Sequence, residues 1–244
     1  MNSDYRPLDV HFPAGVSSFL QANPGYTQLH GRRGLPHDEA YYLFRVLPDW
    51  EQLRLHIPAK TTAVLDIGCG IGGIDFLLHR NLKRAKLTLI DKAERPQNGQ
   101  TFNVLECAEQ FLQANGVPGK DIQTVSSQAP DLFERLQKRR YDLIVSLRAL
   151  GYMFPYDVYA SMIPNLLRPR GRLILDLQTM DRDTLRSRTD DVIYQRFLQA
   201  GFPSEDQVIA RLEADVGPVT EVARWSTLVR LCVRKKASSR PPLP

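Results

Sequence analysis

A run of glycines behind an aspartate is the segment whose residue types most clearly suggest chemistry. Residues 64–73 read VLDIGCGIGG, so an apolar run leads through Asp66 into Gly68, Gly70 and Gly72. Glycine lacks a Cβ, which lets the backbone turn sharply and lie directly against a ligand. A carboxylate at the end of a buried strand is costly unless it meets a partner, so we expect Asp66 to have one.

A second aspartate stands where it could complete a binding site. Asp91 ends the apolar run 87–90, roughly 20 residues beyond the glycines, which is the spacing at which a carboxylate can accept both hydroxyls of a ribose. The glycines also fit the G-x-G-x-x-G pattern of dinucleotide-binding proteins through Gly68, Gly70 and Gly73. An NAD-dependent oxidoreductase is therefore one interpretation, although Asp66 would repel the pyrophosphate of NAD.

The elements that would position these residues alternate between short apolar runs and segments of helical periodicity, which is typical of a parallel sheet with crossover helices. Strands are predicted at 63–65, 87–90, 122–125, 142–145 and 172–175. Helices are predicted after Gly73, over 103–115, over 130–139, from Pro155, and through Val192 and Leu198 to Gly201. Two closing runs, 207–212 and 227–233, are predicted to pair as antiparallel strands joined by a turn at Gly217 and Pro218.

The chain is expected to divide into three regions. Residues 1–58 are rich in Pro, Gly and Tyr, carry one predicted helix over 38–47, and are interpreted as a cap or lid. Residues 59–236 are predicted to form the ligand-binding domain. Residues 237–244 have the composition of a disordered tail.

Composition excludes several classes of protein. An apolar content of 43% over 244 residues can bury a substantial core. No apolar run approaches the roughly 20 residues of a membrane span and the start lacks a signal-peptide core, so a cytoplasmic location is expected. Cys69, Cys107 and Cys232 are predicted to be buried free thiols, and no metal site is expected. The net charge of +5 favours acidic partners.

Read as D-x-G-x-G-x-G, the segment from Asp66 to Gly72 resembles motif I of class I S-adenosylmethionine-dependent methyltransferases, and this reading also accounts for Asp66. The resemblance continues through 141–146 and 166–175 and covers about residues 60 to 235. It implies a Rossmann-like α/β sheet, mostly parallel with an antiparallel C-terminal strand and with helices on both faces. It also implies methyl transfer from S-adenosylmethionine, leaving S-adenosylhomocysteine.

The resemblance assigns residues to the cofactor. It places Asp66 near the ammonium end of the methionine moiety, Asp91 at the ribose, and Ser127 and Gln128 where the family contacts adenine. The full expected set is Asp66, Gly68, Cys69, Gly70, Gly72, Asp91, Lys92, Ser127, Gln128, Ser146 and Leu147.

The methyl acceptor is expected at the carboxyl ends of the fourth and fifth strands, where open α/β sheets bind ligands. No N/D-P-P-Y/F tetrapeptide follows the fourth strand, so nucleic acid is a disfavoured acceptor. Residues 146–156 resemble the corresponding loop of sugar O-methyltransferases, with Met153 where that group has a histidine. The predicted acceptor is a hydroxyl of a small molecule, or of a sugar or glycan. Arg148, Tyr152 and Tyr156 are the predicted substrate-binding residues, and Arg148 would suit an anionic acceptor.

The sequence does not single out a general base. Tyr152, Asp181 and His37 are the candidates, and Asp181 would serve equally well as a helix N-cap. If none of them acts, the chain would be a non-catalytic protein that binds the cofactor and has lost turnover. That alternative stays open beside the methyltransferase and the oxidoreductase.

Overall fold

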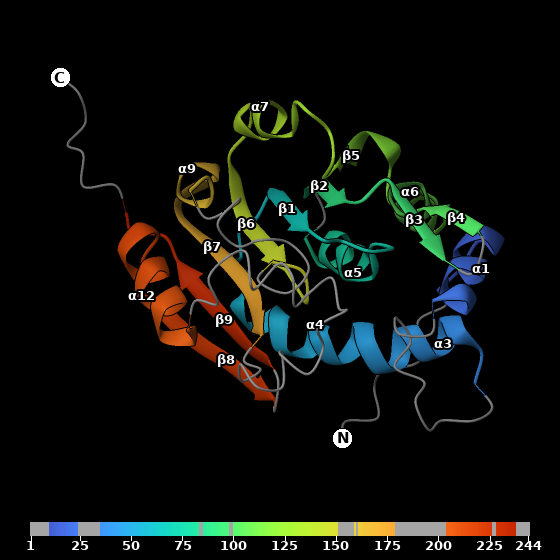
Figure 1. The fold of residues 1–244 in the computed structure, drawn as a ribbon, viewed down its shortest axis with the longest axis horizontal. Coiled ribbons are helices and arrows are strands. Elements are labelled where there is room, and N and C mark those ends of the chain that lie inside the picture. The colour runs from blue at the N-terminus through green and yellow to red at the C-terminus, as the bar shows by residue number, and fades with distance from the viewer. Residues whose placement is uncertain are drawn as a thin grey trace.

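The computed structural model describes residues 10–23, 35–82, 85–97, 100–150, 159, 161–178, 204–225 and 228–237. Within these ranges a seven-stranded sheet runs through the molecule in the order β5-β2-β1-β6-β7-β9-β8 (Figure 1). Its strands are β1 (Ala63–Ile67), β2 (Lys86–Asp91), β5 (Ile122–Ser126), β6 (Tyr141–Ser146), β7 (Leu167–Gln178), β8 (Val219–Trp225) and β9 (Leu228–Arg234).

Five of these strands are parallel. β1 pairs in parallel with β2 and β6, β2 with β5, and β6 with β7, whereas β9 runs antiparallel to both β7 and β8. The carboxyl ends of β1, β2, β6 and β7 therefore lie at one edge of the sheet. This arrangement confirms the predicted sheet, mostly parallel with an antiparallel C-terminal strand.

Helices cover both faces of the sheet (Figure 1). Alternate strand residues feed two separate cores, because Val64 and Leu87 belong to one apolar cluster while Leu65 and Ile90 belong to the other. The first core is closed by α1 (Ala14–Ala22), α3 (His37–Tyr41), the π-helical η1 (Tyr42–Val46), α4 (Leu47–Leu53), α5 (Gly73–Asn81) and α6 (Val104–Ala114). The second is closed by α7 (Leu132–Gln137), α9 (Ile163–Leu166) and α12 (Glu205–Asp215).

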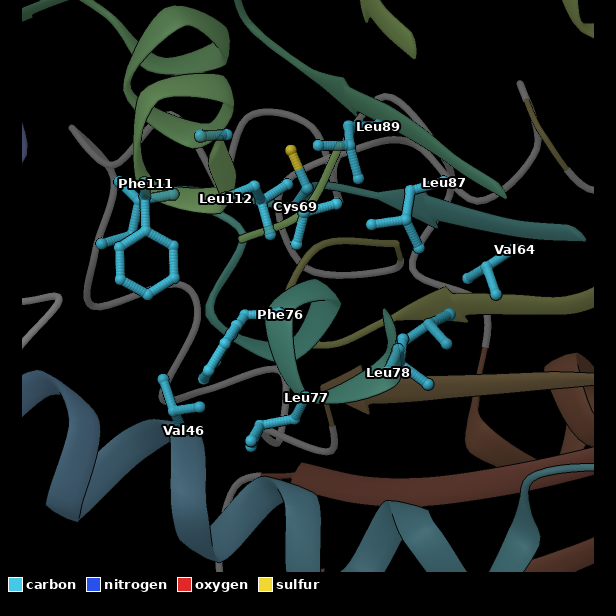
Figure 2. Packing of buried hydrophobic residues seen from close by; sticks show 14 of the residues in the cluster. Val46, Val64, Cys69, Phe76, Leu77, Leu78, Leu87, Leu89, Phe111 and Leu112 are labelled. Atoms are coloured by element: carbon cyan, nitrogen blue, oxygen red, sulfur yellow. The ribbon is translucent and has the colours of Figure 1, made fainter. Parts of the chain in front are cut away.

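The helix predicted over 38–47 belongs to a longer helical run in which α3, η1 and α4 follow one another and end in the 3-10 turn η2 (Arg54–His56). Its apolar side packs on the first core, where Val46 lies beside Phe76 and Leu77 of α5 (Figure 2). The helical run is thus part of the same core as the sheet.

The strand predicted over 207–212 is wrong, because these residues lie in α12. Ser204 begins that helix with a capping box: its Oγ accepts a hydrogen bond from the Gln207 N–H at 3.2 Å, and its own N–H donates to Gln207 Oε1 at 2.8 Å. Val208 and Leu212 are buried one helical turn apart, which is a helical repeat. The strand that pairs with β9 is instead β8.

The remaining predicted helices are in part confirmed and in part lie outside the described residues. The helix over 103–115 is confirmed as α6, where Asn103 Oδ1 accepts from the Glu106 N–H at 3.1 Å, and Gly116 follows with a φ of +85°. The hairpin of β3 (Glu94–Gln97) and β4 (Gln100–Asn103) was not predicted. The helices predicted from Pro155 and through Val192 and Leu198 lie outside the described residues, as do positions 238–244 of the predicted tail.

The described part of the chain also bears on the class of protein. All three cysteines are free and buried, as predicted. None of the helices described is long and apolar enough to cross a membrane. No group of three or more His, Cys, Asp or Glu side chains among these residues could hold a metal ion.

Candidate functional site

A pocket opens at the edge of the sheet where β1, β2 and β6 end. It is enclosed by the glycine turn, the ends of β2 and β6, and the helical run of α3, η1 and α4. The residues that line it are Tyr41, Arg45, Val46, Asp49, Asp66, Gly68, Cys69, Gly70, Ile74, Asp91, Lys92, Arg95, Leu147, Arg148 and Ala149.

The glycine turn after β1 has a conformation that side chains disfavour. Gly68, Gly70 and Gly72 have φ angles of +84°, +57° and +76°, in the left-handed region that glycine adopts at little cost. The N–H groups of residues 68 and 69 both donate to the carbonyl oxygen of Ile90, at 2.7 and 3.1 Å. The turn is thereby fixed against the end of β2, and its backbone forms one wall of the pocket.

Asp91 connects the two ends of this wall. Its Oδ2 accepts from the Gly70 N–H at 2.8 Å and its Oδ1 from the Lys92 N–H at 2.7 Å. Burial raises the pKa of this carboxyl, and the two N–H donors oppose the rise. Each carboxylate oxygen keeps further acceptor capacity, so Asp91 can still accept hydrogen bonds from a ligand in the pocket that it lines.

Asp66 lies deeper at the end of β1. It is 5% exposed, and its Oδ1 has no hydrogen-bond partner among the described residues. Burial raises the pKa of Asp66 well above its ordinary value, and the negative charges of Asp75 and Asp91 add to the rise. A buried carboxyl oxygen without a donor is costly, which indicates that a ligand supplies one.

Cys69 lines the pocket, but its environment suppresses thiolate chemistry. Burial raises the pKa of the thiol, and the carboxylates of Asp91, Asp66 and Asp75 raise it further. The Sγ donates instead to the carbonyl oxygen of Gly70 at 3.4 Å. A protonated thiol is a poor nucleophile, so we assign Cys69 to the pocket wall.

The other residues predicted to contact the cofactor lie differently. Ser146 is fully buried: its Oγ donates to the Ile67 carbonyl and accepts from the Leu150 N–H, both at 2.8 Å, so it joins the ends of β6 and β1. The Ser127 N–H donates to the Asp91 carbonyl at 2.7 Å, and Gln128 is exposed. The pocket brings together Asp66, Gly68, Cys69, Gly70, Asp91, Lys92 and Leu147 from the expected set, and Gly72, Ser127, Gln128 and Ser146 do not line it.

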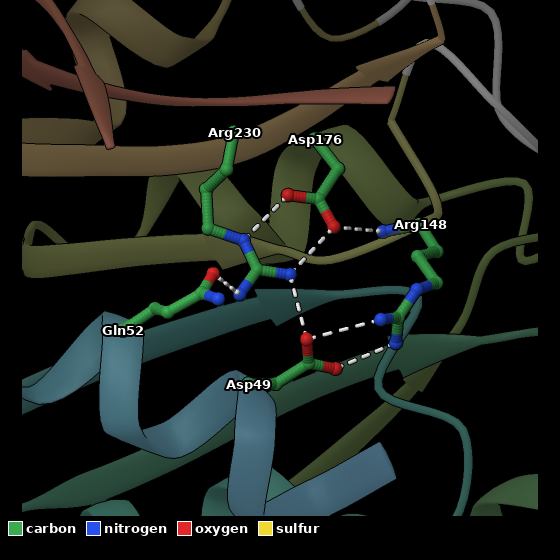
Figure 3. Close-up of polar contacts among 5 residues, drawn as sticks. All are labelled: Asp49, Gln52, Arg148, Asp176 and Arg230. Atoms are coloured by element: carbon green, nitrogen blue, oxygen red, sulfur yellow. Dashed lines mark hydrogen bonds and ion pairs between the residues drawn. The ribbon is translucent and has the colours of Figure 1, made fainter. Parts of the chain in front are cut away.

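Two aspartates and two arginines form a largely buried ion-pair network that reaches the pocket at Asp49 and Arg148 (Figure 3). Arg230 of β9 donates from Nε to Asp176 Oδ1 at 2.7 Å, and its Nη2 donates to Asp176 Oδ2 and Asp49 Oδ1, both at 2.9 Å. Arg230 and Asp176 are fully buried. Burial raises the pKa of Asp176 and Arg230 opposes that rise, so the paired charges compensate one another.

Arg148 joins this network at the pocket surface. Its two Nη atoms donate to the two carboxylate oxygens of Asp49 at 2.6 and 3.1 Å, and its backbone N–H donates to Asp176 Oδ2 at 3.1 Å. The backbone φ of Arg148 is +54°, in the left-handed region that residues other than glycine rarely adopt. The guanidinium of Arg148, predicted to bind the methyl acceptor, is therefore paired with Asp49.

The remaining predicted site residues can be placed only in part. His37 begins α3 and does not line the pocket. Tyr152, Tyr156 and Asp181 lie outside the described residues.

Sequence reasoning missed Asp49, Asp176 and Arg230. A usable signal existed for the last two, because Asp176 follows an apolar run as Asp66 and Asp91 do, and Arg230 interrupts the apolar run LVRLCV.

A family model described as a methyltransferase domain matches residues 40–212 of this chain. No curated protein matches the chain.

Three solved structures illustrate the fold likeness. An O-methyltransferase family protein from Burkholderia thailandensis has a TM-score of 0.55 and 14% identity over 88% of this chain and 64% of its own. The mitomycin 7-O-methyltransferase has a TM-score of 0.51 and 16% identity over 91% and 64%. Magnesium protoporphyrin IX methyltransferase from Synechocystis PCC 6803, solved with S-adenosylhomocysteine bound, has a TM-score of 0.50 and 16% identity over 78% and 82%. This chain thus spans less than two thirds of the length of the first two.

Proposed function

This chain belongs to the methyltransferase domain family, with a class I Rossmann-like fold, and on that premise we propose that it moves a methyl group from S-adenosylmethionine to a hydroxyl of a small anionic acceptor. A hydroxyl of a phosphorylated sugar or glycan is one acceptor of this kind. The observation that carries the proposal is that Asp66, the left-handed glycine turn and Asp91 line one pocket at the carboxyl edge of the sheet.

The pocket fits the cofactor at both of its polar ends. The unpartnered Oδ1 of Asp66 is an acceptor that suits the ammonium group of the methionine moiety. The Asp91 carboxylate, held by two backbone N–H groups, suits the two ribose hydroxyls. Between them, the glycine turn lets the ligand approach the backbone closely.

The bound cofactor would supply a methyl group on a sulfonium, which is a good leaving group for an in-line displacement. The chain's own contribution is then mainly orientation, for which roughly 7–11 kcal/mol is available in favourable cases. Leu147, Arg148 and Ala149 line the side of the pocket beyond β6, where the acceptor would lie. Tyr41 and Val46 line it from the helical run, where they would exclude water.

The charges along the pocket support an anionic acceptor. Arg45, Lys92 and Arg95 line it, and the guanidinium of Arg148, which also lines it, is paired with Asp49. A hydroxyl acceptor must also lose its proton, a step worth about 10²–10⁴-fold when a base is positioned for it. Tyr152 and Asp181 remain the proposed candidates for that base, and His37, the third candidate, does not line the pocket.

Binding measurements test the cofactor assignment. In calorimetric titrations, the protein should bind S-adenosylhomocysteine and should not bind NADH. Asp91→Ala should weaken the binding by about 1.5–3 kcal/mol, the usual cost of a lost charged hydrogen bond. The exposed acid variant Asp131→Ala serves as the matched control and should bind as the wild type does, because Asp131 pairs with Arg135 outside the pocket.

The alternatives predict other outcomes. Binding of NADH without S-adenosylhomocysteine would favour the oxidoreductase and refute the proposal. Binding of S-adenosylhomocysteine with no methylated product from a broad panel of anionic alcohols and phenols would favour the non-catalytic protein. Because Asp91 also fixes the glycine turn, the melting temperature of Asp91→Ala is measured first, and Asp91→Asn, which keeps one acceptor oxygen, replaces it if the turn is lost.

A further inference from the structure

Asp75 is a buried acid that the proposed function does not use. It lies in the first turn of α5, it is 0% exposed, and neither of its carboxylate oxygens has a hydrogen-bond partner among the described residues. Its carboxyl is the side-chain neighbour of Asp66, whose Oδ1 also lacks a donor. Three carboxylate oxygens without a donor among the described residues are therefore buried together between the end of β1 and the first turn of α5.

Two neighbouring buried carboxyls cannot both be ionised without a cation, and one proton between them resolves the conflict. The protonated carboxyl then donates a hydrogen bond to the ionised one, so one oxygen of each carboxyl has a hydrogen-bond partner. Burial raises the pKa of Asp66 well above its ordinary value and that of Asp75 to about 7. The N-terminus of α5 stabilises negative charge on Asp75, so Asp66 is the group that carries the proton.

Among the described residues, no cationic side chain shifts the pKa of Asp75. The helix α5 packs against η1, α4, α6 and β2. Of the charged groups on these elements, only Arg45, Asp49 and Asp91 line the pocket with Asp66 in the described part of the chain. Lys92, Arg95 and Arg148 line the pocket from other segments. The negative charges of Asp91, Asp66 and Asp75 all raise the pKa of the Cys69 thiol.

We propose that Asp66 and Asp75 form a proton-sharing carboxyl pair that gives up its proton when the ammonium end of the cofactor binds. The inference rests on the proposed function, because it needs a cationic ligand at Asp66. On binding, the proton leaves the carboxyl of Asp66 for solvent, and the ammonium N–H groups take its place as donors to the ionised pair. No covalent bond other than this O–H bond is broken, and the positive charge of the ammonium group replaces that of the released proton.

The exchange makes cofactor affinity depend on pH. The unliganded pair holds the proton more tightly than the liganded pair, so raising the pH favours the complex. The dissociation constant should fall by up to tenfold for each pH unit below the pKa of the unliganded pair and should level off above it.

Calorimetry in buffers with different ionisation enthalpies measures the proton directly. Titrating S-adenosylhomocysteine in phosphate and in Tris at pH 7 should show release approaching one proton for each ligand bound. 5′-Methylthioadenosine, which lacks the amino-acid end, should bind without release. Asp75→Asn should bind S-adenosylhomocysteine without releasing a proton, because the amide of Asn donates to Asp66 and leaves that carboxyl ionised. The control Asp131→Asn should match the wild type.

Equal proton release by wild type and Asp75→Asn would overturn the inference. Any proton exchanged by the ligand's own amino group is common to both proteins, so the difference between them reports the pair alone. Failure of S-adenosylhomocysteine to bind would instead count against the proposed function.

A ligand-free measurement keeps the pair testable in that case. A carboxyl whose pKa is raised by folding stabilises the protein at low pH and loses that contribution as the pH rises through the raised pKa. The melting temperature of Asp75→Asn relative to wild type should therefore increase between pH 4 and pH 8. A constant difference would overturn the pair, and Asp66→Asn gives the same test if Asp75→Asn does not fold.

Discussion

Three strands of the sheet carry a buried aspartate at or near their carboxyl end, and the surroundings of the three carboxyls differ. Asp91 accepts two backbone N–H groups, Asp176 accepts from Arg230 and from the Arg148 N–H, and Asp66 has an oxygen without a partner. Since a buried carboxylate is stable only when compensated, the difference indicates their roles. Asp176 is part of the ion-pair network, Asp91 fixes the glycine turn and lines the pocket, and Asp66 is the aspartate for which we propose a ligand as the missing donor.

The ion-pair network gives a stability prediction. Arg230→Ala should destabilise the protein by about 3–5 kcal/mol in urea unfolding, because it leaves Asp176 as a buried charge without a cationic side chain, whereas Asp49 keeps its pair with Arg148. Arg224→Ala on the neighbouring strand β8 is the matched control. Arg224 pairs with Glu205 and Glu221 in solvent, where such pairs contribute about 0–1 kcal/mol. Similar losses for the two variants would contradict the compensation that we assign to Arg230.

The part of the pocket formed by the glycine turn and the two aspartates could be predicted from the sequence because it is local. Asp66 and the glycines lie within a few positions of one another, and Asp91 follows at a fixed spacing. The network could not be predicted in the same way, since Asp49 and Arg230 are 181 residues apart and only the tertiary fold brings them together. Nor does any local pattern show that the Asp75 side chain is buried rather than exposed to solvent.

At the scale of elements, the predictions hold where one periodicity dominates. The parallel strands were predicted from apolar runs, and α6 from its cap and its terminal glycine. Residues 207–212 were misassigned because a short apolar run fits a strand or a helix, and the capping box at Ser204 decides for the helix. The strand β8 was missed because its exposed side chains are mostly polar, as expected at the edge of a sheet.

The contact between the N-terminal helical run and α5 leads to an element-scale prediction. A Cβ added at Gly73 would lie 2.5 Å from Val46 Cγ2 and 2.6 Å from Tyr41 Oη, so the two helices could not keep their separation. We expect Gly73→Ala to cost about 1–3 kcal/mol in chemical unfolding.

Gly15→Ala is the matched control in helix α1. Its Cβ would meet only the end of the Gln110 side chain at 3.3 Å, which can move away. That variant should be neutral or up to about 1 kcal/mol more stable, because alanine favours the helix. If Gly73→Ala were as stable as Gly15→Ala, the close approach of the helical run would be contradicted.

At the scale of the whole molecule, residues from four distant segments close one site. Asp49 of α4, Arg148 after β6, Asp176 of β7 and Arg230 of β9 join the helical run to the carboxyl edge of the sheet (Figure 3). The run also supplies Tyr41, Arg45 and Val46 to the pocket. The segment predicted as a cap thus helps to build the pocket as well as to cover the core.

The most direct test of this account is a crystal structure of the protein with S-adenosylhomocysteine. We predict that the ligand lies along the glycine turn, with its ammonium group within hydrogen-bond distance of Asp66 and its ribose hydroxyls within hydrogen-bond distance of Asp91. A ligand bound away from the carboxyl edge of the sheet, or in the pocket with neither aspartate in contact, would contradict it.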